Sequence, residues 1–282
     1  MAERIHLDAF AVPVETRAPT GATNAYLLGR RDALLVDPAA RTEALDTVVA
    51  ARDVGHVAVT HTHPDHVGAV ADYAAETEAV VWARRPGRFR AATGVEPDRR
   101  LAEGTTVPTG EGPVTVLDVP GHAPDHVAFG LPDGAVVCGD VAADEGSVVV
   151  GADDGDLRGY LTALRRLYAR DPPRLHPGHG PRIDDPRATC RRLLAHRRDR
   201  ERRVRAAVES RAGGSDAPGV AVDAVVDAAY EKDLAGVADL ARATVRAHLE
   251  KLDREGAVAY DRDVERVRPL RASGGATDGR AR

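Results

Sequence analysis

The 282-residue sequence contains few cysteines and few aromatic residues. Its two cysteines, Cys138 and Cys190, exclude a disulfide-stapled scaffold and a cysteine-rich zinc site. Because only 4% of the residues are aromatic, the core must consist of Val, Leu and Ala. No apolar run approaches the ~20 residues of a membrane span, and the first residues lack the basic-then-apolar pattern of a signal peptide. We therefore expect a cytoplasmic protein that has no membrane partner.

Lysine is also rare, since only two of the 39 basic residues are lysine and the rest are arginine. The net charge of −5 divides unevenly along the chain: residues 1–180 carry −9 and residues 181–282 carry +4. This asymmetry predicts two parts with different surfaces. The length is consistent with one large domain followed by a small one.

The first part alternates short apolar runs with turn residues, as expected for layered sheets and helices. Two hairpins are predicted, over residues 25–36 and 127–138, and the second has an Asp-Gly turn. Further strands are predicted at 56–60, 79–82 and 114–117. Helical periodicity fits residues 41–52, 67–76 and 156–170.

Histidines crowd into one segment directly after the predicted strand 56–60. His61, His63, Asp65 and His66 lie within six residues, where the strand ends and a helix is expected to begin. Alternate residues of a strand point the same way, so His61 and His63 face one centre. Asp65 and His66 turn with the chain and can face a second centre. Imidazole and carboxylate ligands suit zinc, and also iron or manganese.

Three more side chains of the same chemistry follow strands farther along the chain. His122, Asp140 and His179 each stand beside a glycine, which lets the backbone approach closely. We expect these loops to converge with the first one at a single sheet edge, where a rigid scaffold holds them. Cys138 follows an apolar run and is interpreted as a core residue.

The pattern HxHxDH, followed by a single His, a single Asp and a single His, resembles the metallo-β-lactamase superfamily over residues 5–185. The resemblance implies an α/β fold, an αββα sandwich, with two metals between the edges of its sheets. It implies that His61, His63 and His122 bind the first metal. It likewise implies that Asp65, His66 and His179 bind the second metal, and that Asp140 bridges the two.

The metals are expected to be two Zn²⁺ ions, with Mn²⁺ or Fe²⁺ as alternatives. Two such ions share a water and lower its pKa toward neutrality, and the bridging hydroxide attacks a carbonyl carbon or phosphorus. Asp65 is predicted to be catalytic as well as a ligand. Asp37 matches a strand-end aspartate of the family and is interpreted as support for the ligands. His126 is expected either to line the substrate pocket or to cap a turn.

The second part reads as three helices, at 188–210, 221–230 and 237–255, followed by two extended pieces at 257–260 and 264–267. This is the order of elements in a winged helix. We therefore predict a hydrolase domain at 1–185, a winged-helix domain at 186–270 and a disordered tail at 271–282.

The string Leu175–Pro181 and the basic segment after His196 resemble the β-lactamase-like protein 2 subfamily, whose members include a single-strand-specific endoribonuclease. The first hypothesis is a di-zinc hydrolase of that type, with an anionic substrate such as single-stranded RNA. The second is a glyoxalase II-like thioesterase, although no basic pocket with tyrosines for a glutathione tail is evident. The third is a winged-helix nucleic-acid-binding regulator with a non-catalytic metal domain, which the complete ligand set disfavours.

Overall fold

A computed structural model describes residues 4–212, 219–231 and 233–270. The predicted disordered tail at 271–282 lies outside these residues. The chain divides into two compact units. The first comprises Met1–Val148 and Asp154–Ala195, and the second comprises Val149–Asp153 and His196–Arg282. The predicted boundary after residue 185 stays a prediction; it coincides with the start of the helix α6.

The first sheet has six strands in the order β1-β2-β3-β4-β5-β6. The strands are β1 (Leu7–Pro13), β2 (Ala22–Leu28), β3 (Ala33–Val36), β4 (Val54–Ala58), β5 (Val80–Ala83) and β6 (Arg99–Arg100). β2 and β3 pair antiparallel, which confirms the first predicted hairpin, whereas β3 to β6 run parallel. The edge strand β1 was not predicted because all its residues except Asp8 are apolar, so its sequence lacks the alternation of polar and apolar types that marks a half-buried strand, although its burial alternates from Ala9 to Pro13.

The second sheet has five strands in the order β11-β10-β9-β8-β7. They are β7 (Thr106–Val107), β8 (Val114–Asp118), β9 (Val127–Gly130), β10 (Val136–Gly139) and β11 (Leu175–Pro177). β9 and β10 pair antiparallel, which confirms the second predicted hairpin. β11 pairs parallel with β10, so β8, β10 and β11 all point the same way.

The two sheets pack through alternate residues of their strands. In β2, Tyr26 and Leu28 enter the core shared with the second sheet, while Ala25 and Leu27 enter the core beneath the helices. The same alternation in β3 sends Leu34 one way and Leu35 the other. Successive side chains of these strands point to opposite faces of the sheet, and both faces are apolar. The first sheet therefore contributes to two separate cores, one on each face.

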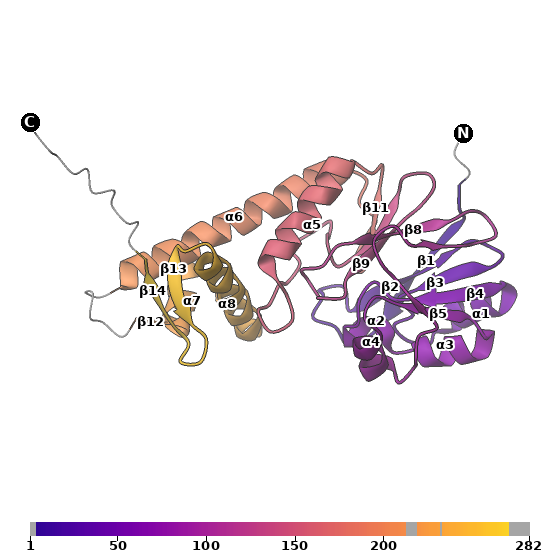
Figure 1. The fold of residues 1–282 in the computed structure, drawn as a ribbon, viewed down its shortest axis with the longest axis horizontal. Coiled ribbons are helices and arrows are strands. Elements are labelled where there is room, and N and C mark those ends of the chain that lie inside the picture. The colour runs from indigo at the N-terminus through magenta and orange to yellow at the C-terminus, as the bar shows by residue number, and fades with distance from the viewer. Residues whose placement is uncertain (1–3, 213–218, 232, 271–282) are drawn as a thin grey trace, which may run out of the picture. The chain divides into compact units, whose positions relative to one another are not determined.

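Helices complete the layers of the first unit (Figure 1). They are α1 (Glu43–Ala51), α2 (Pro64–Val67), α3 (Val70–Thr77), α4 (Pro86–Thr93) and α5 (Leu157–Arg170). α1, α3 and α4 share the core on the outer face of the first sheet, through residues such as Leu45, Tyr73 and Phe89. The predicted helix at 67–76 corresponds to α3, which begins at Val70 after a turn at Gly68 and Ala69; the short helix α2 precedes that turn. α4 was missed, because Pro86 and Gly87 at its start read as a turn.

The second unit contains the part of α6 (Pro186–Arg211) that follows Ala195, together with α7 (Val222–Ala229), α8 (Ala238–Arg254) and the strands β12 (Val220–Ala221), β13 (Val258–Asp261) and β14 (Arg266–Pro269). These strands form a sheet in the order β12-β14-β13, and the unit has its own core. β14 begins two residues later than the strand predicted at 264–267, because Asp261 and Glu265 (φ +50°) form the turn before it. The identification as a winged helix stays a prediction. Among the described residues, no helix combines the length and apolarity needed to cross a membrane.

Gly121 fixes the loop that follows β8 against α5. A Cβ there would lie 2.1 Å from the backbone nitrogen of Tyr160, and its φ is +144°. We predict that Gly121→Ala lowers the free energy of unfolding by about 3 kcal/mol, because neither the loop backbone nor the backbone of α5 can move far enough to accommodate the added Cβ. Gly104→Ala is the control: φ is +77°, no atom lies within 4 Å, and a loss of about 1 kcal/mol is expected. Urea unfolding measures both, and equal losses would refute the packing argument.

Candidate metal centre

The predicted ligands meet where strands of both sheets end. β8, β10 and β11 run in the same direction, and His122, Asp140 and His179 follow them at one edge. His61 and His63 follow β4 at the carboxyl edge of the parallel part of the first sheet. The candidate ligands therefore come from both sheets. The prediction of a single sheet edge was wrong on this point, because the strand before His61 belongs to the first sheet and the other three strands belong to the second.

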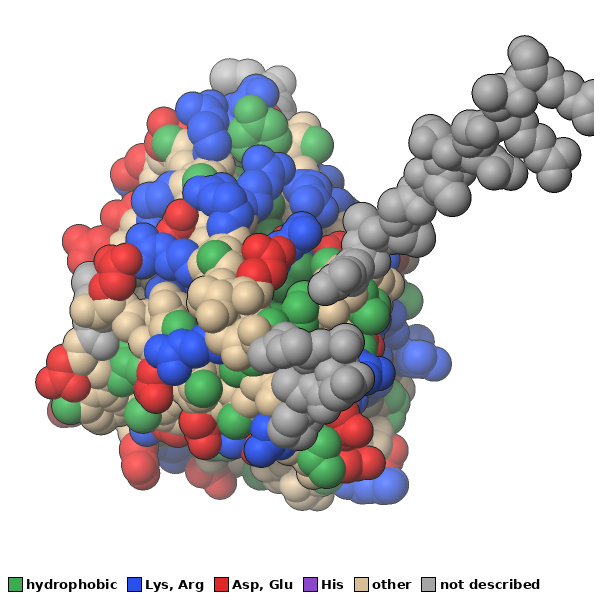
Figure 2. Space-filling view, turned by 90° about the vertical axis from the view of Figure 1, so that its left-hand side faces the viewer, with side chains coloured by type: hydrophobic (Ala, Val, Ile, Leu, Met, Phe, Trp, Pro, Cys, Tyr) green, Lys and Arg blue, Asp and Glu red, His purple; other side chains and the backbone are tan. Residues whose placement is uncertain are grey.

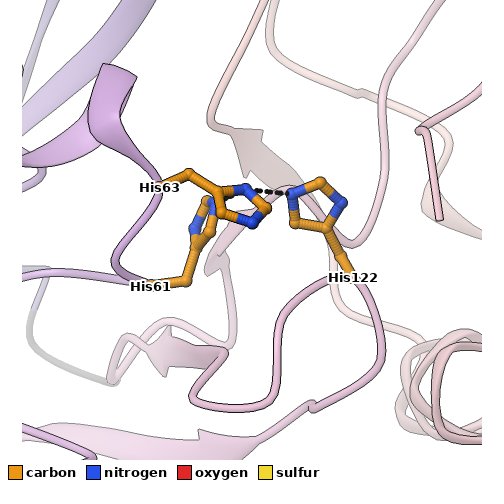
Figure 3. A group of neighbouring side chains, drawn as sticks. All are labelled: His61, His63 and His122. Atoms are coloured by element: carbon orange, nitrogen blue, oxygen red, sulfur yellow. Dashed lines mark hydrogen bonds between the residues drawn. The ribbon is translucent and has the colours of Figure 1, made fainter. Parts of the chain in front are cut away.

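The first group consists of His61, His63 and His122, whose ligand nitrogens lie within 4.8 Å of one another. His63 Nδ1 lies 3.0 Å from His61 Nε2 and 2.9 Å from His122 Nε2. Figure 3 shows the three rings turned toward one another from two separate loops. Three nitrogens bound at ~2.1 Å to a tetrahedral ion would lie about 3.4 Å apart. The observed spacing is slightly tighter, and it fits one ion after a small expansion.

The second group consists of Asp65, His66 and His179, and Asp140 lies between the two groups. Asp140 Oδ2 is 3.3 Å from His179 Nε2 and 3.5 Å from His122 Nε2, while its Oδ1 is 3.7 Å from His66 Nε2. One carboxylate therefore faces imidazoles of both groups. This is the position expected of a bridging ligand.

Asp37 lies behind the ligands and is completely buried at the end of β3. Its Oδ1 accepts a hydrogen bond from the Thr60 backbone at 2.6 Å, and its Oδ2 accepts one from the Thr60 hydroxyl at 2.7 Å. Oδ2 also lies 3.0 Å from His66 Nδ1. A proton on His66 Nδ1 leaves the Nε2 lone pair directed at the metal site, so Asp37 has the supporting contact that the sequence suggested.

Two residues that support His63 were missed in the sequence. His63 Nε2 lies 2.9 Å from Asp154 Oδ2, and Arg88 of α4 donates to the same oxygen at 2.5 Å and to the Thr62 hydroxyl at 2.8 Å. Asp154 orients the His63 ring with Nδ1 toward the other ligands. The signal was weak, because Asp154 belongs to an acidic run and α4 was not predicted.

His126 is buried and accepts a hydrogen bond from the Asp140 backbone at 2.9 Å through Nε2. Its ring stacks on His61 with centroids 4.7 Å apart. It therefore holds the loop of Asp140 and does not line a pocket open to solvent. Burial lowers the pKa of His126 well below its usual range, and the imidazole stays neutral.

Cys138 is a buried core residue, as predicted. Burial raises the pKa of its thiol far above the usual range and raises the pKa of Cys190 to about 11. Neither thiol is a thiolate near neutral pH, so neither serves as a nucleophile there.

The charge balance of the site favours added cations. Burial opposes a charge on His66, yet the carboxylates of Asp37 and Asp140 outweigh it and raise the pKa of His66 to about 9. Burial also opposes ionisation of Asp140, but His66, His179 and His122 hold the pKa of that carboxyl well below its usual range. Without a metal, the buried carboxylates draw a proton onto an imidazole. A divalent ion would replace that proton.

The residues present fit two such ions. His66 Nε2 is completely buried, and it has no hydrogen-bond partner among the described residues. Gly178 leaves the required space, since a Cβ there would lie 2.3 Å from Asp140 Oδ1 and 2.8 Å from His66 Cε1. A buried imidazole nitrogen that faces carboxylates and has no hydrogen-bond partner is a metal-ligand arrangement once a cation replaces its proton. The individual ligand assignments stay predictions.

Comparison with known proteins agrees with this geometry. The Metallo-beta-lactamase superfamily model matches residues 18–179. Beta-lactamase-like protein 2 homologs of Drosophila melanogaster and Caenorhabditis elegans are each 29% identical, covering 74% and 64% of this chain. The matches span 72% of the fly protein and 64% of the worm protein, less than two thirds of the latter. A hydroxyacylglutathione hydrolase of Acidiphilium cryptum is 32% identical over 56% of this chain and 64% of its own length.

Solved structures show the same fold. A metallo-beta-lactamase family protein from Thermus thermophilus superposes with a TM-score of 0.74 and 24% identity, over 94% of this chain and 98% of its own. A protein solved in a di-iron-bound form has a TM-score of 0.50 and 32% identity, over 62% of this chain and 94% of its own. Since the family model covers more than half of its length, this chain belongs to the metallo-beta-lactamase superfamily.

Proposed function

We propose that this protein is a di-metal hydrolase that cleaves an acyl thioester or a related ester. The observation that carries the proposal is Asp140, whose two oxygens face imidazoles of both ligand groups. Two divalent cations held there would supply an activated water and would stabilise the oxyanion that develops on the substrate.

Each side chain then has a distinct task. His61, His63 and His122 would hold the first cation, and Asp65, His66 and His179 the second, with Asp140 between them. The side chains of His61 and His66 are completely buried, whereas those of His63 and Asp65 are 26% and 18% exposed. Substrate therefore approaches over His63 and Asp65.

Asp65 is the residue we propose to act directly in catalysis. Its Oδ2 accepts a hydrogen bond from the Thr16 hydroxyl at 2.5 Å and lies 3.5 Å from His179 Nε2. Thr16 holds the carboxylate in one orientation at the exposed side of the site. In that position Asp65 can accept a proton from the attacking water.

Thioesters are the favoured substrate class because of the relatives. The hydroxyacylglutathione hydrolase described above is named for a thioester-cleaving activity. The site itself adds a chemical reason. A thiolate leaves without a proton, so no buried general acid is required beside the ligands.

Single-stranded RNA is the second candidate, and α6 is the observation that favours it. Arg198, Arg202 and Arg205 are exposed and share one face of that helix at spacings of four and three residues. Lys and Arg side chains gather in the upper part of the surface that Figure 2 shows. Arg202 and Arg205 are partly neutralised by Asp199 and Glu209. Guanidinium groups spaced in this way can bind successive phosphates.

The metal assignment predicts which substitutions release metal. His61→Ala and Asp140→Ala should each lower the bound divalent metal from two equivalents to one or fewer, because each removes a ligand from the interior of the site. Metal analysis of the purified protein measures this. His176→Ala, a half-buried residue outside the ligand groups, is the control and should keep both ions. Unchanged metal content in the first two variants would refute the site.

The space left by Gly178 makes a second prediction. Gly178→Ala should weaken binding of the second cation by at least tenfold, because the added Cβ would collide with the side chains of Asp140 and His66. Gly87→Ala is the matched control, since a Cβ there meets no atom within 4 Å. Chelator competition gives both dissociation constants, and equal affinities in the two variants would contradict the prediction.

The substrate class is tested by direct turnover. The zinc- or manganese-loaded protein is offered S-lactoylglutathione, single-stranded RNA and a chromogenic cephalosporin, and we expect hydrolysis of the thioester. Asp65→Asn should lower kcat by about 100-fold or more, since its amide accepts no proton. RNA cleavage without thioesterase activity would favour the second candidate. A protein that binds two ions and turns over none of the three would overturn the proposed substrate classes.

A further inference from the structure

The loop that presents His179 is held by a strand of the opposite sheet. Asn24 lies in β2, and its Nδ2 donates to the carbonyl of Pro177 at 2.9 Å and to that of Gly180 at 2.8 Å. Its backbone nitrogen donates to the carbonyl of Gly178 at 2.7 Å. One residue therefore binds three of the four carbonyls in the segment 177–180.

Neighbouring residues of β2 add to this hold. The Tyr26 hydroxyl donates to the Pro177 carbonyl at 2.6 Å, and His179 Nδ1 lies 2.8 Å from the Ala22 carbonyl. A proton on His179 Nδ1 leaves Nε2 free, and Nε2 lies 3.3 Å from Asp140. β2 thus determines both the position of the loop and the orientation of the His179 ring.

We propose that Asn24 is a positioning residue for the second metal and acts through His179. The inference rests on the proposed di-metal centre. A loop with its carbonyls bound by Asn24 directs the His179 ring at Asp140. The hydrogen bonds of Asn24 described above all end on backbone carbonyls of this loop, so its effect passes through the position of His179.

The chemistry of the amide explains why asparagine stands here. Its NH₂ group supplies two donors in one plane, and both are used on carbonyls that belong to different residues. Aspartate has the same shape but no donor, and its charge would face two carbonyl oxygens. Asn24→Asp therefore keeps the size of the side chain and replaces two hydrogen bonds with repulsion of the loop carbonyls.

A merely structural role for Asn24 would affect the protein as a whole. A positioning role is specific, because only the cation that depends on His179 should bind more weakly. A double-mutant cycle separates the two. If Asn24 acts through His179, its substitution has no further effect once His179 is absent, but it keeps its full effect when a ligand of the other group is removed.

The experiment measures zinc and manganese dissociation constants by chelator competition in Asn24→Asp, alone and in the His179→Ala and His63→Ala backgrounds. We expect the second cation of the full-length protein to bind 10- to 100-fold more weakly in Asn24→Asp, with the first cation unchanged. The same loss should appear in the His63→Ala background and vanish in the His179→Ala background. Tyr26→Phe, which removes one hydrogen bond to Pro177, should weaken binding of the same cation to a smaller extent.

Three outcomes would count against the inference. Wild-type affinity in Asn24→Asp would overturn it while the proposed function stands. An equal loss at both cations, or a loss that persists in His179→Ala, would also overturn it. A wild-type protein that binds fewer than two cations would overturn the proposed function, and this inference with it. If Asn24→Asp does not fold, Asn24→Ala carries the same test without the added charge.

Discussion

The carboxylate of Asp140, whose side chain is only 12% exposed, requires positive charge around it, and the surrounding residues supply that charge. Removing a carboxylate from water is costly unless an opposite charge and hydrogen bonds replace the solvent. Imidazoles of His66, His122 and His179 surround Asp140, and His126 binds its backbone. Without metal, a proton on His66 provides part of the compensation. Divalent ions would provide more, so the electrostatic condition that makes this carboxylate costly to bury also favours a bound cation.

The fold meets this condition by bringing two sheets together at their ends. Parallel strands in each sheet place their carboxyl ends at one edge, and short loops leave little freedom to the residues that follow. Asp37 and Asp154 then orient one imidazole in each ligand group. The precision of the site comes from these carboxylates as much as from the ligands themselves.

The candidate ligands could be picked out in the sequence because their spacing is local, and their roles as ligands stay predictions. His61, His63, Asp65 and His66 follow one strand, and each remaining candidate follows another. The sequence placed all of these loops at a single sheet edge, whereas their strands belong to two sheets. Residues whose partners are far apart in the chain were not predictable in this way. Arg88 lies in a helix that begins with Pro86 and Gly87 and reads as a turn, and it meets Asp154 across 66 positions. Asn24 meets Gly180 across 156 positions, with no local pattern to mark it.

The helix α6 has a consequence for how the chain could be divided. Cys190 and Leu193 are buried on the part of α6 that belongs to the first unit, which continues to Ala195. A fragment that ends at residue 185 would leave the apolar surface beneath them open to water. The helix therefore serves both units in turn: its first turns close one core, and Val204 and Val208 farther along belong to the other. Recombination of this hydrolase with another C-terminal module would have to join the two sequences inside a helix that is continuous from Pro186 to Arg211, and not at a flexible linker.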